Sequence, residues 1–196
     1  MKFDVVIIGG GLAGTSAATE LQKSGLKCIL VADGLSLYNC PKNEFKAAGG
    51  TVLQGDRVVS GDFEDGRLLR VYTAKLGNEP LEAGQFVLAT GKYFSRGLVA
   101  DMDKVYEPLF NLDVEYDTDR LSWFDPSFAA PQRFLEFGVK TSGALALKGG
   151  VPIDNLYPAG EVLAGVSSAQ GDATEQILNS ARQAVRAIRR TDYAGE

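Results

Sequence analysis

Three glycines near the start of the chain have the spacing of a phosphate-binding turn. Gly9, Gly11 and Gly14 follow an apolar run over residues 5–8 and form the pattern G-x-G-x-x-G. In that pattern the first glycine permits a tight turn, the second lets the backbone approach a pyrophosphate, and the third lets a helix pack close to a strand. The N–H groups at the start of the helix then hold the phosphate charge. The spacing predicts dinucleotide binding; a glycine-tolerant turn without a ligand is the alternative.

The elements around this turn read as a β-α-β unit. Residues 5–8 lack polar alternation, as in a parallel strand buried on both faces. Residues 12–24 have apolar side chains at helical spacing, and Gly25 fits the left-handed position past the helix end. Residues 26–31 give the second apolar strand, so the turn lies where a dinucleotide-binding fold requires it.

An acidic residue that binds the ribose is expected at the end of the second strand. Asp33 is the only acid there, and Ala32 occupies the usual position of the acid. Either the loop brings Asp33 to the ribose, or this contact is missing. No arginine follows, so a 2′-phosphate is not expected.

Composition excludes several classes of function. The chain has 196 residues, a net charge of −5, two cysteines and no histidine. An acidic total argues against nucleic acid, and no segment approaches the ~20 apolar residues of a membrane span. The lack of histidine removes catalytic triads and haem ligation, and the two cysteines are too far apart for a metal-ligand pair. Two unpaired cysteines predict a cytoplasmic protein without a metal.

The middle of the chain reads as a series of strands. A helix over residues 41–48 is followed by strands over 51–53, 57–60, 67–75 and 85–90, with Asp65-Gly66 as a two-residue hairpin turn. We interpret these strands as an antiparallel meander that precedes a final apolar strand. That strand ends in Ala89-Thr90-Gly91.

Residues 92–150 have little regular pattern but are rich in aromatic side chains. An irregular layer packed on the sheet is the favoured interpretation, and a partner-binding surface with aromatic anchors is the alternative. Three arginines in this stretch can hold a phosphate or carboxylate, or form ordinary surface ion pairs: Arg96, Arg120 and Arg133.

The last third regains regular structure. Residues 155–161 read as a short strand that ends in Gly160-Glu161. A final helix is expected from Asp172, with Asp172 and Glu175 as a capping box. Its predicted buried stripe comprises Ile177, Ala181, Ala184 or Val185, and Ile188, and its predicted exposed arginines are Arg182, Arg186, Arg189 and Arg190.

Three separated segments are therefore expected to meet at one edge of a doubly wound α/β sheet. They are the glycine turn and the two strand ends at Gly91 and Gly160, and ligands bind at the carboxyl edge of such sheets. No catalytic residue or metal ligand is assigned. The candidate cofactor-binding residues are Gly9, Gly11, Leu12, Ala13, Gly14, Asp33, Val58, Ala89, Thr90, Gly91, Gly160 and Glu161.

These segments resemble flavoproteins with two dinucleotide-binding domains, and more closely the family of B subunits of anaerobic glycerol-3-phosphate dehydrogenase. The likeness rests on five segments: KFDVVIIGGGLAG (2–14), VLATGKYFSRGLVA (87–100), EPLFNLDV (107–114), APQRFLEFGVKT (130–141) and NLYPAGEVLAG (155–165). It implies a single Rossmann-like FAD/NAD(P)-binding domain over residues 1–196, with a parallel sheet, an antiparallel meander crossover, an irregular excursion at about 92–150 and a C-terminal helix.

The resemblance also implies FAD, with FMN as the alternative, and electron transfer linked to anaerobic glycerol 3-phosphate oxidation. The implied partners are a catalytic flavoprotein subunit and a membrane-associated iron–sulfur subunit, which would hold this chain at the inner face of the membrane without insertion. Two departures stand out: only residues 34–48 remain of a long family segment, and the last helix starts with acidic residues instead of glycines. Alternatives are a non-catalytic scaffold that no longer binds flavin and, less well supported, a nicotinamide-binding protein.

Overall fold

The computed structural model describes residues 1–33, 39–127, 130–167 and 173–193, and the side chains of 39–41, 192 and 193 are left aside. Its helices are α1 (Leu12–Lys23), α2 (Asn39–Ala47) and α3 (Ala173–Tyr193), with short 3₁₀ turns η1 (Arg120–Ser122), η2 (Arg133–Glu136) and η3 (Gly160–Val162). The principal sheet is built from β1 (Lys2–Ile8), β2 (Cys28–Ala32), β3 (Thr51–Gln54), β4 (Val58–Glu64), β5 (Arg67–Thr73), β6 (Leu81–Leu88) and β14 (Leu156–Pro158).

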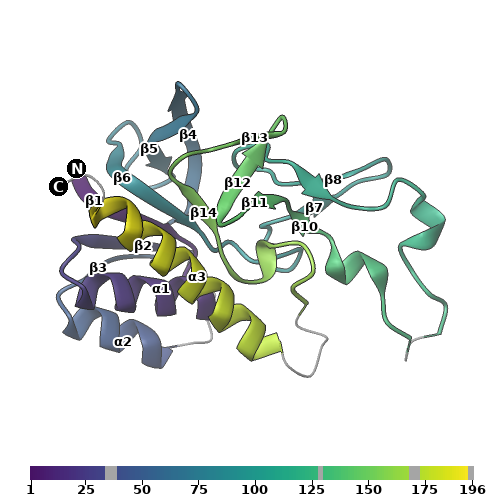
Figure 1. The fold of residues 1–196 in the computed structure, drawn as a ribbon, viewed down its shortest axis with the longest axis horizontal. Coiled ribbons are helices and arrows are strands. Elements are labelled where there is room, and N and C mark those ends of the chain that lie inside the picture. The colour runs from purple at the N-terminus through teal and green to yellow at the C-terminus, as the bar shows by residue number, and fades with distance from the viewer. Residues whose placement is uncertain (34–38, 128–129, 168–172, 194–196) are drawn as a thin grey trace.

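Seven short strands form small separate sheets in the second half of the chain. They pair as β7 (Val99–Ala100) with β8 (Val105–Tyr106), β9 (Val114–Glu115) with β10 (Gly138–Val139), and β12 (Leu145–Lys148) with both β11 (Thr141–Ser142) and β13 (Val151–Pro152). In Figure 1 the segment with β7 to β10 extends away from the helices as an irregular arm beside the main sheet.

The main sheet has the strand order β3-β2-β1-β6-β5-β4, with β14 also paired to β6. One edge of β6 pairs with β1, while the other is shared: β5 lies against its first residues and β14 against Phe86–Leu88. The sheet therefore changes from antiparallel to parallel along a single strand. Asn155 holds this junction, because its side chain accepts the Leu68 N–H at 2.9 Å and donates to the Leu68 carbonyl at 2.7 Å.

The prediction of an antiparallel meander is correct for β4, β5 and β6, which pair antiparallel in that order, but wrong for the strand before them. Asp65 and Gly66 both have positive φ, as the two-residue turn requires. β3 instead pairs parallel with β2 in the register Leu30↔Val52. β3 has only four residues, and so short a segment does not show which neighbouring strand it will pair with. Because α2 crosses back over the sheet before it, a parallel pairing results.

The sheet is not doubly wound within the described residues. Alternate residues of β1 face opposite sides: Val5 and Ile7 pack with α1, α2 and α3, whereas Val6 and Ile8 pack with the irregular segment. All three helices of the described ranges cover one face (Figure 1). The other face is covered by buried aromatic and aliphatic side chains of residues 92–150, which confirms packing of that segment on the sheet.

The C-terminal helix α3 packs against α1 with the predicted apolar stripe. Ala181, Ala184, Val185 and Ile188 are buried, and Ile177 is half-buried. The four predicted arginines are exposed. The predicted capping residue Asp172 lies outside the described residues. No helix in the described ranges combines the length and apolar character needed to cross a membrane.

Candidate functional site

Three parallel strands end in one row at the carboxyl edge of the sheet. Ile8 of β1 and Pro158 of β14 both have Leu88 of β6 as their register partner. The N–H of Ala89 donates to the Ile8 carbonyl at 2.8 Å, and the N–H of Ala159 donates to the Leu88 carbonyl at 2.9 Å. This alignment brings the segments after all three strands together, as the sequence predicts.

Gly9 and Gly14 form the tightly packed part of the turn between β1 and α1. Gly9 has a φ of +111°, and a Cβ built on it would lie within 3.0 Å of the Ala89 carbonyl oxygen. A Cβ on Gly14 would lie within 3.0 Å of the Gly9 carbonyl oxygen. Both positions therefore require glycine because backbone atoms occupy the space of a side chain.

Gly11 has the opposite surroundings. It adopts an ordinary φ of −75° before the first residue of α1, Leu12, and no heavy atom of the described residues lies within 4 Å of a Cβ built on it. Its carbonyl accepts the Thr15 hydroxyl at 2.7 Å, which fixes the first turn of the helix. Neither conformation nor packing requires glycine here, and the open side at the helix start is where a pyrophosphate would approach.

Gly160 brings the third strand end against the start of α1. It has a φ of +80°, and a Cβ on it would lie 2.7 Å from the Cβ of Ala13. Its N–H donates to the Ser180 hydroxyl at 2.8 Å, which ties it to α3. Glu161, the next residue, is half-buried in η3. The predicted residues Ala13, Gly160 and Glu161 are thus neighbours.

Thr90 supplies a polar atom that has no protein partner in the described part of the chain. Its hydroxyl oxygen is buried and makes no hydrogen bond there, although its carbonyl accepts the Ser95 hydroxyl at 2.6 Å. Gly91 follows with a φ of +72°, and a Cβ there would collide with Ser95. A buried hydroxyl without a partner is costly, and a ligand at this strand end would satisfy it.

Lys92 belongs to the same strand end and was not predicted from the sequence. It is buried, and its ammonium donates to the carbonyls of Leu135 and Val166, the latter at 2.7 Å. Burial lowers the pKa of Lys92 to about 8, while the negative charges of Glu161 and Glu136 act in the opposite direction. Lys92 thereby joins the loop after β6 to two later segments of the chain.

The end of β2 holds the predicted acid and an unpredicted base. Asp33 is exposed directly after the strand, and Lys42 of α2 is buried near it. Val58 is the first residue of β4 and is buried in the core cluster that also contains Val31 and Leu88. Binding roles for Asp33, Val58 and the other candidate residues stay predictions.

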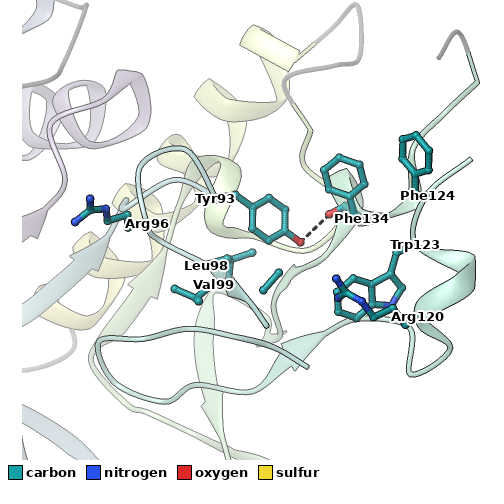
Figure 2. Close-up of a pocket in the computed structure, with 9 residues that line it drawn as sticks. Tyr93, Arg96, Leu98, Val99, Arg120, Trp123, Phe124 and Phe134 are labelled. Carbon is teal, nitrogen blue, oxygen red and sulfur yellow. Dashed lines mark hydrogen bonds between the residues drawn. The ribbon is translucent and has the colours of Figure 1, made fainter. Parts of the chain in front are cut away.

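An open pocket of about 660 Å³ lies in the irregular segment beyond the β6 strand end. Figure 2 shows Tyr93 between Arg96 on one side and Trp123 and Arg120 on the other, with its hydroxyl donating to the Phe134 carbonyl at 2.9 Å. The pocket is lined by Tyr93, Arg96, Leu98, Val99, Ala100, Arg120, Trp123, Phe124 and Phe134.

The three arginines of this segment have different surroundings. The exposed side chain of Arg133 forms an ion pair with the half-buried Asp117 at 3.0 Å. Arg120 stacks on Trp123 at 4.5 Å from the ring centre and donates to the Asp101 carbonyl at 2.8 Å. Arg96 is exposed and has a φ of +61°, which is uncommon outside glycine. Arg96 and Arg120 line the pocket, whereas Arg133 forms an ordinary ion pair at the surface.

Comparison with known proteins agrees with this geometry. The family model described as an FAD binding domain matches residues 4–40 and 38–173. The B subunit of anaerobic glycerol-3-phosphate dehydrogenase from Yersinia pseudotuberculosis serotype I (strain IP32953) is 41% identical over 138 residues, which are 70% of this chain and 32% of that protein. The B subunit of the same enzyme from Aliivibrio fischeri (strain MJ11) is 37% identical over 178 residues, with 82% of this chain and 39% of that protein covered.

Among solved structures, a thioredoxin reductase from Gloeobacter violaceus superposes with a TM-score of 0.60 at 12% identity, covering 98% of this chain and 96% of that one. That likeness shows the fold. The chain belongs to the FAD-binding domain family, and FAD is the cofactor that its open Gly11 turn and the buried Thr90 hydroxyl fit. The matched region covers 32% and 39% of the lengths of these two curated relatives, so this chain spans well under half of each.

Proposed function

We propose that this chain is an FAD-binding subunit that passes electrons in an oxidoreductase linked to anaerobic glycerol 3-phosphate oxidation. The relatives named as B subunits of the anaerobic dehydrogenase support the reaction, and the family match supports the cofactor. The chemistry that bound FAD supplies is the uptake and release of electrons. The residues of this chain bind and orient it.

One observation carries the proposal. A Cβ on Gly11 would meet no atom of the described residues within 4 Å, whereas a Cβ on Gly9 or Gly14 would overlap a backbone carbonyl. Gly9 and Gly14 shape the turn, and the free space at Gly11 leaves room for a pyrophosphate beside the N-terminus of α1. Thr90 and Gly160 lie at the two neighbouring strand ends, so they would line the path from the pyrophosphate towards the ribityl chain. We expect Glu161 to lie beside the ribityl chain of the flavin.

Binding is expected to be non-covalent. The chain has no histidine, and burial raises the pKa of Cys28 to about 12, so its thiol stays protonated at neutral pH. The other cysteine, Cys40, lies in the part of α2 whose side chains are not described.

Flavin absorbance of the purified protein, followed by titration with FAD and with FMN, tests the proposal. FAD should bind and FMN should bind more weakly, because FMN lacks the pyrophosphate and adenosine that the β1-α1-β2 unit is shaped to hold. A colourless protein that takes up neither flavin would contradict the proposal and favour a scaffold that has lost its cofactor.

The proposed partner is the catalytic subunit of the same enzyme, and an iron–sulfur subunit would connect the pair to the membrane. Four exposed apolar residues support a docking site on the irregular segment, and we call them the aromatic surface: Phe94, Met102, Leu121 and Phe124. Phe94 is 97% exposed and Leu121 is 90% exposed, and both are next to residues that line the pocket. Phe124 itself lines the pocket, and large exposed apolar side chains are typical of a protein–protein interface.

A further inference from the structure

Lys42 is a buried cation for which the described residues offer no partner. Its side chain is 4% exposed, and its Nζ atom is buried and makes no hydrogen bond within the described ranges. Lys42 lies three residues before Phe45, which is fully buried, so both lie on the face of α2 that packs inward. A buried ammonium without a partner is costly, and proteins normally pair such a charge.

The side chain of Lys42 ends at the glycine turn. A Cβ built on Gly10 would lie 3.4 Å from the Lys42 Cε and within 3.0 Å of the Ala32 Cβ. The atom bonded to Cε is the ammonium nitrogen, so the charge lies at the junction of the turn and the end of β2. This is the edge at which Gly11 leaves its open side.

Charged neighbours in the described part of the chain do not neutralise Lys42. Asp33 is the nearby opposite charge, but it is exposed and makes no hydrogen bond to the Lys42 ammonium. Lys46, one turn further along α2, is a like charge. Burial is the main effect and lowers the pKa of Lys42, while Asp33 opposes it. An anion bound at the turn would supply the missing partner.

We propose that the Lys42 ammonium binds a phosphate oxygen of the nucleotide held at the Gly9–Gly14 turn. The proposal extends the proposed FAD site by a residue outside the glycine pattern. The phosphate has two possible sources: the pyrophosphate of FAD, or a 2′-phosphate on the adenosine ribose, which the sequence alone did not lead us to expect. The pyrophosphate and the 2′-phosphate present the same anionic oxygens to Lys42, and binding of different nucleotide probes distinguishes these two sources.

Equilibrium binding of four probes to the full chain and its variants tests this: FAD, ADP, adenosine 2′,5′-bisphosphate and adenosine. Lys42→Met should weaken binding of the phosphate-bearing probes about tenfold or more, as loss of a hydrogen bond to a charged group does, and leave adenosine unchanged. Lys46→Met is the matched control because it removes an exposed positive charge from the same helix. It should change each affinity by less than about twofold.

The pattern of probes identifies the phosphate. A loss for FAD and ADP, with or without a loss for the 2′,5′-bisphosphate, assigns Lys42 to the pyrophosphate, because the 2′,5′-bisphosphate also carries a 5′-phosphate. A loss confined to the 2′,5′-bisphosphate assigns Lys42 to the 2′-phosphate. Ligand-free Lys42→Met should unfold at the same temperature as the wild type or higher, because an unpaired buried charge has been removed. A merely structural role for Lys42 predicts the reverse.

Equal affinities of wild type and folded Lys42→Met for every probe would overturn the inference and leave the FAD proposal intact. Wild-type binding of the 2′,5′-bisphosphate without FAD binding would overturn the FAD proposal and leave the inference about Lys42 intact. Binding of none of the phosphate-bearing probes by the wild type would overturn both. If Lys42→Met does not fold, Lys42→Gln, which is also neutral and can form hydrogen bonds, replaces it in the same comparison.

Discussion

Gly14 packs directly on the carbonyl oxygen of Gly9, five residues earlier in the chain, and this contact closes the turn between β1 and α1. Gly9 in turn packs on the Ala89 carbonyl at the end of β6. The two contacts join a turn, a helix and a neighbouring strand without any side chain. Gly11 takes no part in them, and its freedom from packing separates what the turn needs for folding from what it needs for a ligand.

Gly11→Val should therefore abolish FAD binding in a protein that stays folded. The Cβ of the valine meets no atom of the described residues within 4 Å, but the side chain occupies the space of the pyrophosphate. We expect affinity for FAD to fall more than about tenfold, with a change in the free energy of unfolding below about 1 kcal/mol. Flavin titration and urea unfolding measure the two effects.

Gly14→Val is the matched control for this prediction. It should destabilise the protein by about 3 kcal/mol or more, because the side chain would overlap the Gly9 carbonyl. Undiminished FAD occupancy in folded Gly11→Val would mean that the phosphate lies elsewhere.

Lys92 should make the stability of the protein depend on pH in the alkaline range. Its folded pKa of about 8 is below the ordinary value of 10.5, so between these values the unfolded chain binds the additional proton. Stability therefore rises with pH through this window, by about 3 kcal/mol at most. A neutral amine still has two N–H groups for the carbonyls of Leu135 and Val166, so these contacts persist.

The comparison of wild type with Lys92→Met isolates this effect from other titrating groups, such as Cys28, whose raised pKa lowers stability in the same range. Wild-type stability relative to Lys92→Met, from urea unfolding at pH 7 and pH 10, should increase with pH. A difference that is constant or decreases would mean that the Lys92 pKa is not lowered by folding.

The sequence predicts the local conformation of the glycine turn and of the strand ends better than it predicts how the strands pair and where the helices lie. Gly9, Gly11 and Gly14 carry local information, because turn conformation and close packing are decided within a few residues, and the strand ends at Thr90 and Gly160 are each marked by a glycine motif. The pairing of β3 with β2 and the placement of all three described helices on one face depend on contacts between distant segments. No local pattern encodes such contacts.

Lys42 and Lys92 show the same limit at the level of single residues. Both are buried, and the residues that surround them come from other parts of the chain: Lys92 donates to the carbonyls of Leu135 and Val166, and the side chain of Lys42 ends beside Gly10. Lys42 carries a weak signal in its spacing from Phe45, which places both on one helix face. Lys92 carries none beyond its position directly after Ala-Thr-Gly.

The aromatic surface gives a prediction about assembly. Replacing Phe94 and Leu121 with serine should leave stability within about 0.5 kcal/mol of the wild type for each change, because both side chains are almost fully exposed. Affinity for the proposed catalytic subunit should fall about fivefold or more for each residue that anchors the interface.

Val151→Ser is the control for surface chemistry, because Val151 is 62% exposed on β13, outside the aromatic surface. It should not alter the affinity for the catalytic subunit in a co-purification or titration experiment. Wild-type affinity in the Phe94→Ser, Leu121→Ser double variant would show that the partner binds another face.

The last prediction is that this chain alone does not oxidise glycerol 3-phosphate. Hydride transfer from the substrate carbon needs a base for the hydroxyl proton, a clamp for the phosphate and a site closed to water. The chain has no histidine, and Glu161 is the half-buried carboxylate beside the glycine turn, where we expect it to face the ribityl chain of the flavin. The measurement is dye reduction by the flavin-loaded chain with glycerol 3-phosphate and an artificial electron acceptor. We expect no substrate-dependent rate until the catalytic subunit is added, and sustained turnover by the chain alone would show that it holds a complete active site.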